Sequence, residues 1–77
     1  MEEFIKYLLE NIIENPEALE ISEETDDKGR VIVIDAEDRD KALIIGKGGR
    51  NIKAIRELAF MYAKKHDEEK VFLKIRD

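Results

Sequence analysis

The segment Gly-Lys-Gly-Gly, at residues 46–49, constrains this chain more than any other. Three glycines in four positions allow the backbone to adopt positive φ angles and to approach another chain closely. A helical pattern follows at once, and a helix that begins there directs its free N–H groups toward the glycines. Residues 47–56 hold four basic side chains and no acid: Lys47, Arg50, Lys53 and Arg56. The segment is therefore suited to binding a phosphate backbone.

The length and composition exclude several classes of protein. Seventy-seven residues are enough for one small domain, which we expect to span residues 1–77. Without cysteine there is neither a disulfide nor a Cys-based metal site, and the single His66 cannot build a metal cluster alone. The longest apolar run, residues 58–63, is far shorter than the roughly 20 residues of a membrane span. We expect a cytoplasmic protein with no membrane partner, no cofactor and no bound metal.

An enzyme is not expected, because no nucleophile and base occur at a recognisable spacing. The net charge of −5 would argue against nucleic acid as a partner, but the charge is unevenly distributed. Residues 1–40 hold 14 acids and 4 bases, whereas residues 41–77 hold 5 acids and 10 bases. Because screening limits each charge to about 8 Å at physiological salt, the local balance decides what binds. The basic half is the half that carries the glycine turn.

Hydrophobic periodicity predicts one α+β domain with the order α-β-β-α-α-β. The expected elements are a helix over residues 2–14 ended by Asn15-Pro16, strands over about 18–25 and 31–34 joined by a turn at 26–29, helices over about 39–45 and 50–65, and a strand over 71–76. Asp38 is the expected cap of the second helix. The expected buried stripe of the last helix is Ile52, Ile55, Leu58, Ala59 and Tyr62.

Neither the acidic run nor the aromatic residues of the chain indicate a further binding site. The acidic run over residues 23–27 lacks the spacing of a calcium-binding loop, so we expect a solvated hairpin tip. The five aromatic residues are too scattered to form a base-stacking platform, and most are expected in the core. Phe72 is the exception, because it alternates out of phase with its apolar neighbours in the last strand.

Other glycine-rich motifs do not match the turn. A P-loop requires G-x-x-x-x-G-K-[ST] after a strand, and a dinucleotide-binding fold requires G-x-G-x-x-G within a βαβ unit. Residues 44–52 instead closely resemble the I-I-G-x-x-G-x-x-I signature of the K-homology (KH) domain at every defined position. The loop of that family clamps about four nucleotides of single-stranded nucleic acid. The element order resembles the type II KH arrangement, and the length is similar to that of the small bacterial single-KH proteins of the KhpA group.

The resemblance implies roles for the residues of the turn. Gly46 and Gly49 would allow a sugar–phosphate backbone to lie against the peptide chain. Lys47 and Gly48 occupy the two variable positions, and Lys47 would be the direct phosphate contact. Arg50 would reach a neighbouring phosphate.

The remaining candidate residues have a functional and a structural interpretation. Ile44, Ile45 and Ile52 resemble the apolar floor of the KH groove, on which bases pack, but ordinary core packing is the alternative for each. Lys53 is a candidate phosphate contact, although a solvated helix face explains it equally well.

The resemblance also implies a function. We expect single-stranded RNA binding, with a role as an RNA chaperone or post-transcriptional regulator linked to cell-envelope growth and cell shape. A Jag-type RNA-binding protein or a second copy of the chain is the expected protein partner. The alternative is a protein–protein interaction module whose glycine turn is only structural and whose RNA affinity is negligible. The sequence does not indicate which RNA sequence is preferred, or whether the protein prefers RNA to single-stranded DNA.

Overall fold

The computed structural model describes residues 1–27, 29–66 and 71–76 and confirms the expected α+β order. Its elements are α1 (Glu2–Glu10), η1 (Pro16–Ala18), β1 (Glu20–Asp26), β2 (Gly29–Asp35), α2 (Asp38–Ile45), η2 (Lys47–Gly49), α3 (Arg50–Lys65) and β3 (Val71–Ile75), where η marks a short 3₁₀ helix. The α-helices and strands follow each other as α-β-β-α-α-β, the order that fits the type II KH fold.

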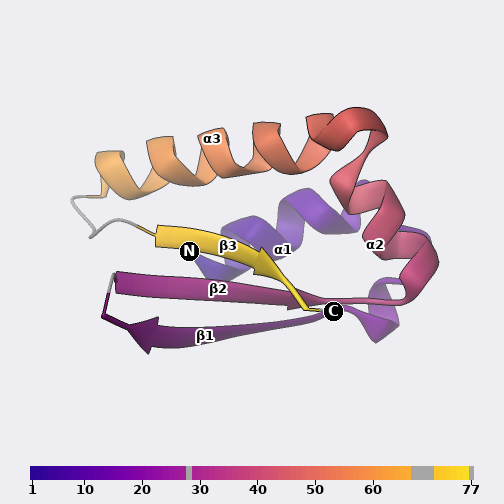
Figure 1. The fold of residues 1–77 in the computed structure, drawn as a ribbon, viewed down its shortest axis with the longest axis horizontal. Coiled ribbons are helices and arrows are strands. Elements are labelled where there is room, and N and C mark those ends of the chain that lie inside the picture. The colour runs from indigo at the N-terminus through magenta and orange to yellow at the C-terminus, as the bar shows by residue number, and fades with distance from the viewer. Residues whose placement is uncertain (28, 67–70, 77) are drawn as a thin grey trace.

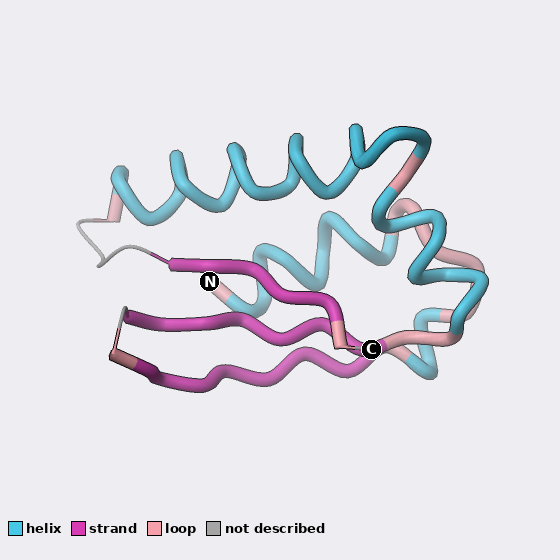
Figure 2. The backbone as a smooth tube through the Cα atoms, viewed as in Figure 1, coloured by secondary structure: helices cyan, strands magenta, loops and turns pink. Residues whose placement is uncertain are grey.

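The three strands form one mixed sheet in the order β1-β2-β3 (Figure 1). β1 pairs antiparallel with β2, with Ile21 opposite Ile34, which confirms the hairpin. Lys28, in the expected hairpin turn, lies outside the described residues. β3 pairs parallel with β2, with Leu73 opposite Ile32. Because parallel neighbours require a crossover, the chain passes through α2, the turn and α3 between β2 and β3 (Figure 2).

The core lies between one face of the sheet and the helices α1 and α3. Residues of α2 and of the segment between α1 and β1 also contribute to it, and its buried members are Ile5, Leu9, Ile13, Leu19, Ile32, Ile34, Ile44, Ile52, Ile55, Ala59 and Leu73. The β-branched residues of β2 suit its central position, since both of its edges are paired. Along α3, the burial of Ile52, Ile55 and Ala59 recurs at helical spacing and fixes which flank of the helix faces the sheet.

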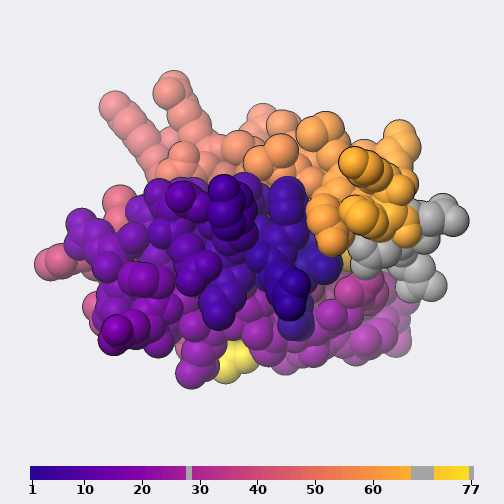
Figure 3. Space-filling view, turned by 180° about the vertical axis from the view of Figure 1, so that it is seen from behind, coloured from indigo at the N-terminus to yellow at the C-terminus, as the bar shows by residue number. Residues whose placement is uncertain are grey.

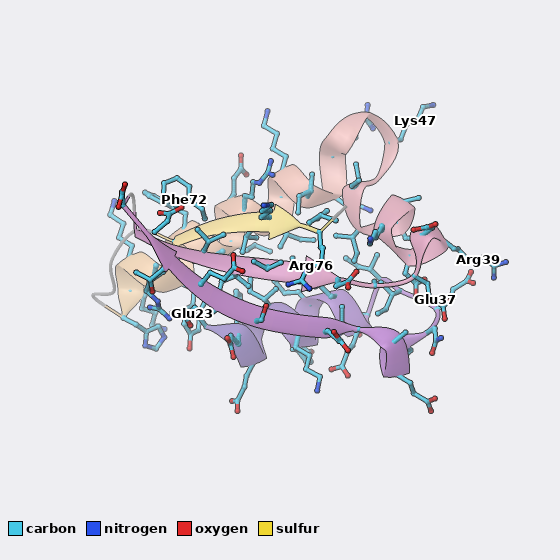
Figure 4. The ribbon with its side chains drawn as sticks, turned by 60° about the horizontal axis from the view of Figure 1, so that its bottom comes forward. Glu23, Glu37, Arg39, Lys47, Phe72 and Arg76 are labelled. Carbon is cyan, nitrogen blue, oxygen red and sulfur yellow. The ribbon has the colours of Figure 1, made fainter. Side chains whose placement is uncertain are left out.

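The opposite face of the sheet is covered by no described helix (Figure 4). Phe72 lies on this face, because it alternates with the buried Leu73, and it is half-buried. Its position agrees with the out-of-phase pattern seen in the sequence. Across the hairpin, Arg30 donates hydrogen bonds to the carboxylate of Glu23, and this contact lowers the pKa of Glu23 below its usual value.

The first helix is shorter than the sequence predicts. α1 ends at Glu10, and the side-chain amide of Asn11 donates to the carbonyl of Tyr7 at 2.7 Å in its last turn. Further along, the backbone N–H groups of Glu14 and Asn15 both donate to the carboxylate of Asp40, at 3.0 Å each. Asp40 belongs to α2 and is only 1% exposed. A long-range contact therefore holds the segment that the sequence assigns to the helix.

The structure also differs from the sequence-based expectation at the first strand, at the start of α2 and along α3. The first strand begins at Glu20 rather than near residue 18, because residues 16–18 form the 3₁₀ helix η1. α2 begins at Asp38 itself, so the residue at its N-cap is Glu37. In α3 the predicted Leu58 is 38% exposed, while Ala63 is buried. The predicted Tyr62 is half-buried, where its ring stacks on Phe4 of α1 at 4.7 Å between centroids.

Candidate nucleic-acid interface

The glycine turn joins α2 to α3 and contains three glycines with positive φ angles. Gly46, Gly48 and Gly49 have φ angles of +75°, +65° and +80°, which non-glycine residues rarely adopt. Gly46 combines its φ with a ψ of 171°, a region that is essentially restricted to glycine. The glycines identified in the sequence are therefore required by the backbone, and they connect α2 to α3, which runs in a different direction (Figure 1).

Asn51 fixes the turn against the end of α2. Its side-chain amide donates a hydrogen bond to the backbone carbonyl of Leu43 at 2.8 Å. The same side chain fills the space beside Gly46, where an added Cβ would lie 2.7 Å from the Asn51 Cγ. Gly46 is thus required both for its backbone angles and for the room that Asn51 occupies. Asn51 stands at an unassigned position of the motif, so the sequence analysis missed it.

The tip of the turn is open to an incoming chain. Lys47 and Gly48 are exposed, and the side chain of Lys47 points away from the body of the protein (Figure 4). A Cβ added at Gly48 or at Gly49 would meet no described atom within 4 Å. Seen from behind, side chains near residue 50 project clear of the surface (Figure 3). A phosphate backbone can therefore approach the main chain of the turn closely.

The start of α3 adds positive potential to the turn. Among the described residues, no side chain makes a capping hydrogen bond at the N-cap Gly49, and the first turn of the helix contains no acid. The positive end of the helix dipole is thus left available to an anion. Arg50 and Lys53 are both exposed and lie within the first turn. The structure brings these two cations to the same end of α3 as Lys47.

The three candidate isoleucines differ sharply in exposure. Ile44 is 0% exposed and Ile52 is 7% exposed, and both belong to the core beneath the turn. Ile45 is 40% exposed, next to Gly46. Ile44 therefore supports the site from below and has no surface to offer a base, whereas Ile45 has one.

Comparison with known proteins agrees with this geometry. A model of the KhpA/KhpB KH-domain family matches residues 2–75 of the chain. This chain belongs to the KhpA/KhpB KH-domain family. A protein of Chlamydia trachomatis named RNA-binding protein KhpA is 36% identical over 75 residues, which cover 97% of this chain and 95% of the relative. Its namesake in Listeria monocytogenes is 33% identical over 69 residues, covering 90% of this chain and 91% of the relative.

The exposure of the aromatic residues in this KH domain differs from the sequence-based expectation. Most of the five aromatic residues are expected in the core, yet Tyr7 and Phe60 are 65% and 56% exposed. Phe60 lies on α3, the helix that begins at the GxxG turn, and the Nζ of Lys64 is 5.8 Å from its ring centroid. A sign of the exposure of Phe60 was present in the sequence, because the basic residues Arg56 and Lys64 stand four positions before and four positions after it on the same side of the helix.

The described part of this KH domain contains neither a cluster of metal ligands nor a membrane-spanning helix. It holds no group of three or more histidine, cysteine, aspartate or glutamate side chains that could bind a metal ion. None of its described helices is both long and apolar enough to cross a membrane.

Proposed function

We propose that this protein binds single-stranded RNA through its GxxG turn. The observation that carries the proposal is the open, cation-rich tip formed by Lys47, Gly48 and the uncapped start of α3. The names of the relatives, which are RNA-binding proteins, support the same ligand. In this account the backbone of the turn and Lys47 contact one phosphate, and Arg50 and Lys53 contact its neighbours.

The apolar part of the site is small. Ile45 is the one candidate isoleucine with a large exposed fraction, so it provides the surface on which a base packs beside the turn. Ile44 and Ile52 act by holding α2 and α3 in position. Contacts to phosphate outnumber contacts to bases in this arrangement, so we expect weak sequence preference.

A salt titration tests the proposal against the rival interpretation of a purely protein-binding module. If three or four phosphates are neutralised, the logarithm of the association constant falls with the logarithm of salt at a slope of roughly −2 to −3. Filter binding of mixed-sequence single-stranded RNA at several salt concentrations measures this slope. An absence of binding at physiological salt would favour the rival, whose support is the net charge of −5.

We also propose that the protein acts together with a second RNA-binding chain. One KH loop holds about four nucleotides, so a single domain gains affinity when it is joined to another. A Jag-type protein is the first candidate, supported by a family model that covers both KhpA and KhpB, and a homodimer is the second. Light scattering during size-exclusion chromatography, with and without the Jag-type protein, distinguishes a monomer from either complex.

The cellular part of the proposal follows from the family resemblance. In this part of the proposal, the protein is a cytoplasmic RNA chaperone or post-transcriptional regulator linked to cell-envelope growth and cell shape. A strand-annealing assay with purified protein tests the chaperone activity. Microscopy of cells that lack the gene tests the link to shape, and failure to restore shape with a turn variant would tie that link to RNA.

A further inference from the structure

One flank of α3 carries basic residues on both sides of an exposed aromatic ring. We call this set the α3 flank; its members are Lys53, Arg56, Phe60 and Lys64. They are spaced by three or four residues, so successive members lie next to each other on the helix surface. At 1.5 Å per residue the α3 flank extends about 17 Å from its first member to its last. It begins within the first turn of α3, beside the GxxG turn.

A groove of about 430 Å³ lies along the α3 flank. It is lined by Lys53, Arg56, Glu57, Phe60 and Met61. The two apolar side chains that line it, Phe60 and Met61, are 56% and 59% exposed. The Nζ of Lys64 lies over one face of the Phe60 ring, 5.8 Å from its centroid, and must move aside if a base stacks on that same face.

The charges of the α3 flank select the occupant of this groove. Lys53, Arg56 and Lys64 supply three positive charges against the single acid Glu57. Single-stranded nucleic acids are bound by this combination, in which a basic groove follows the backbone and aromatic rings stack on the bases. An acidic protein segment would match the charges but would not require an exposed ring. Continuity with the GxxG turn favours a strand that is already held there.

We infer that the α3 flank extends the RNA site beyond the nucleotides held at the turn. The base of a following nucleotide stacks on Phe60, and the basic members of the flank bind the phosphates on either side of it. This inference rests on the proposed RNA binding at the turn. It assigns to Phe60 a role as a base-stacking residue, and it predicts that the protein binds a longer RNA more tightly than one that fills only the GxxG loop.

Oligonucleotides of two lengths test the role of Phe60. Mixed-sequence single-stranded RNAs of about 4 and about 12 nucleotides are titrated onto the full chain at one salt concentration. Phe60→Ala should weaken binding of the longer RNA about five- to tenfold and leave the shorter one unchanged. Phe60→Tyr keeps a ring and should bind like the native protein, whereas Phe60→Leu keeps only apolar area and should resemble Phe60→Ala. Tyr7→Ala, which removes a ring of similar exposure from α1, is the matched control.

The outcomes separate this inference from the proposal on which it rests. If Phe60→Ala binds both lengths like the native protein, while Lys47→Asp with Gly48→Asp binds neither, RNA binding at the turn stands and the stacking role is overturned. An equal loss from Phe60→Ala with both lengths, or native binding by Phe60→Leu, also contradicts stacking beyond the turn. If the native protein binds neither RNA, both proposals fail.

Discussion

The side-chain amide of Asn51 donates a hydrogen bond to the carbonyl oxygen of Leu43 at 2.8 Å and so links α3 back to the last turn of α2. Leu43 lies three residues before Gly46, and Asn51 lies two residues after Gly49, so the bond spans the whole GxxG turn. It satisfies a carbonyl at the end of α2, where intrahelical partners run out. The bond also fixes the angle at which the two helices present Lys47 and Gly48.

Replacing Asn51 by alanine is therefore expected to lower both the stability and the RNA affinity of the protein. The lost hydrogen bond costs about 1 kcal/mol of unfolding free energy. RNA affinity should fall several-fold as well, because the turn is no longer held in one geometry. Asn11→Ala is the control, since Asn11 donates a similar bond to the carbonyl of Tyr7 at the end of a different helix, α1. Equal RNA affinity of the two variants, measured by fluorescence anisotropy, would contradict this role for Asn51.

The glycines of the turn should respond unequally to substitution. Gly46→Ala places a Cβ against Asn51 and forces a backbone conformation that is essentially restricted to glycine, so it should cost about 3 kcal/mol or more. Gly48→Ala meets open space and carries only the left-handed penalty, about 1 kcal/mol. Urea denaturation of both variants measures the difference. A Gly48→Ala variant that is as unstable as Gly46→Ala would show that the turn is packed differently.

The sequence predicted the parts of the fold that local chemistry determines. Hydrophobic periodicity located the strands and the last helix to within two residues, because burial on one face imposes the repeat. The glycine spacing located the turn, because positive φ angles leave few alternatives to glycine. The two basic residues of the first turn of α3, Arg50 and Lys53, followed from the same segment.

The features that the sequence missed depend on contacts between distant residues. The end of α1 could not be placed from Asn15-Pro16, since the backbone there is held by Asp40, about 25 residues away. The exposure of Leu58 and Phe60 depends on which flank of α3 faces the sheet. Apolar character alone does not separate a core residue from an exposed one on an amphipathic helix.

Asp40 is expected to matter for stability and little for RNA affinity. Its buried carboxylate accepts hydrogen bonds from two backbone N–H groups, and Asp40→Ala would leave both without that partner. The expected loss is about 2–4 kcal/mol of unfolding free energy. Asp40→Asn keeps the shape and one acceptor oxygen, so it should lose less. Asp38→Ala, at an exposed position of the same helix, is the control and should stay within about 1 kcal/mol of the native protein.

The measurement that tests the account most directly is the RNA affinity of the double variant Lys47→Asp with Gly48→Asp. Both positions are exposed, and aspartate tolerates the left-handed φ of Gly48 better than most residues, so the fold should persist. Lys6→Glu with Tyr7→Glu makes the same change in net charge on the exposed side of α1 and serves as the control. We predict that the turn variant loses binding to single-stranded RNA while the control retains it. Native affinity in a folded turn variant would contradict the account.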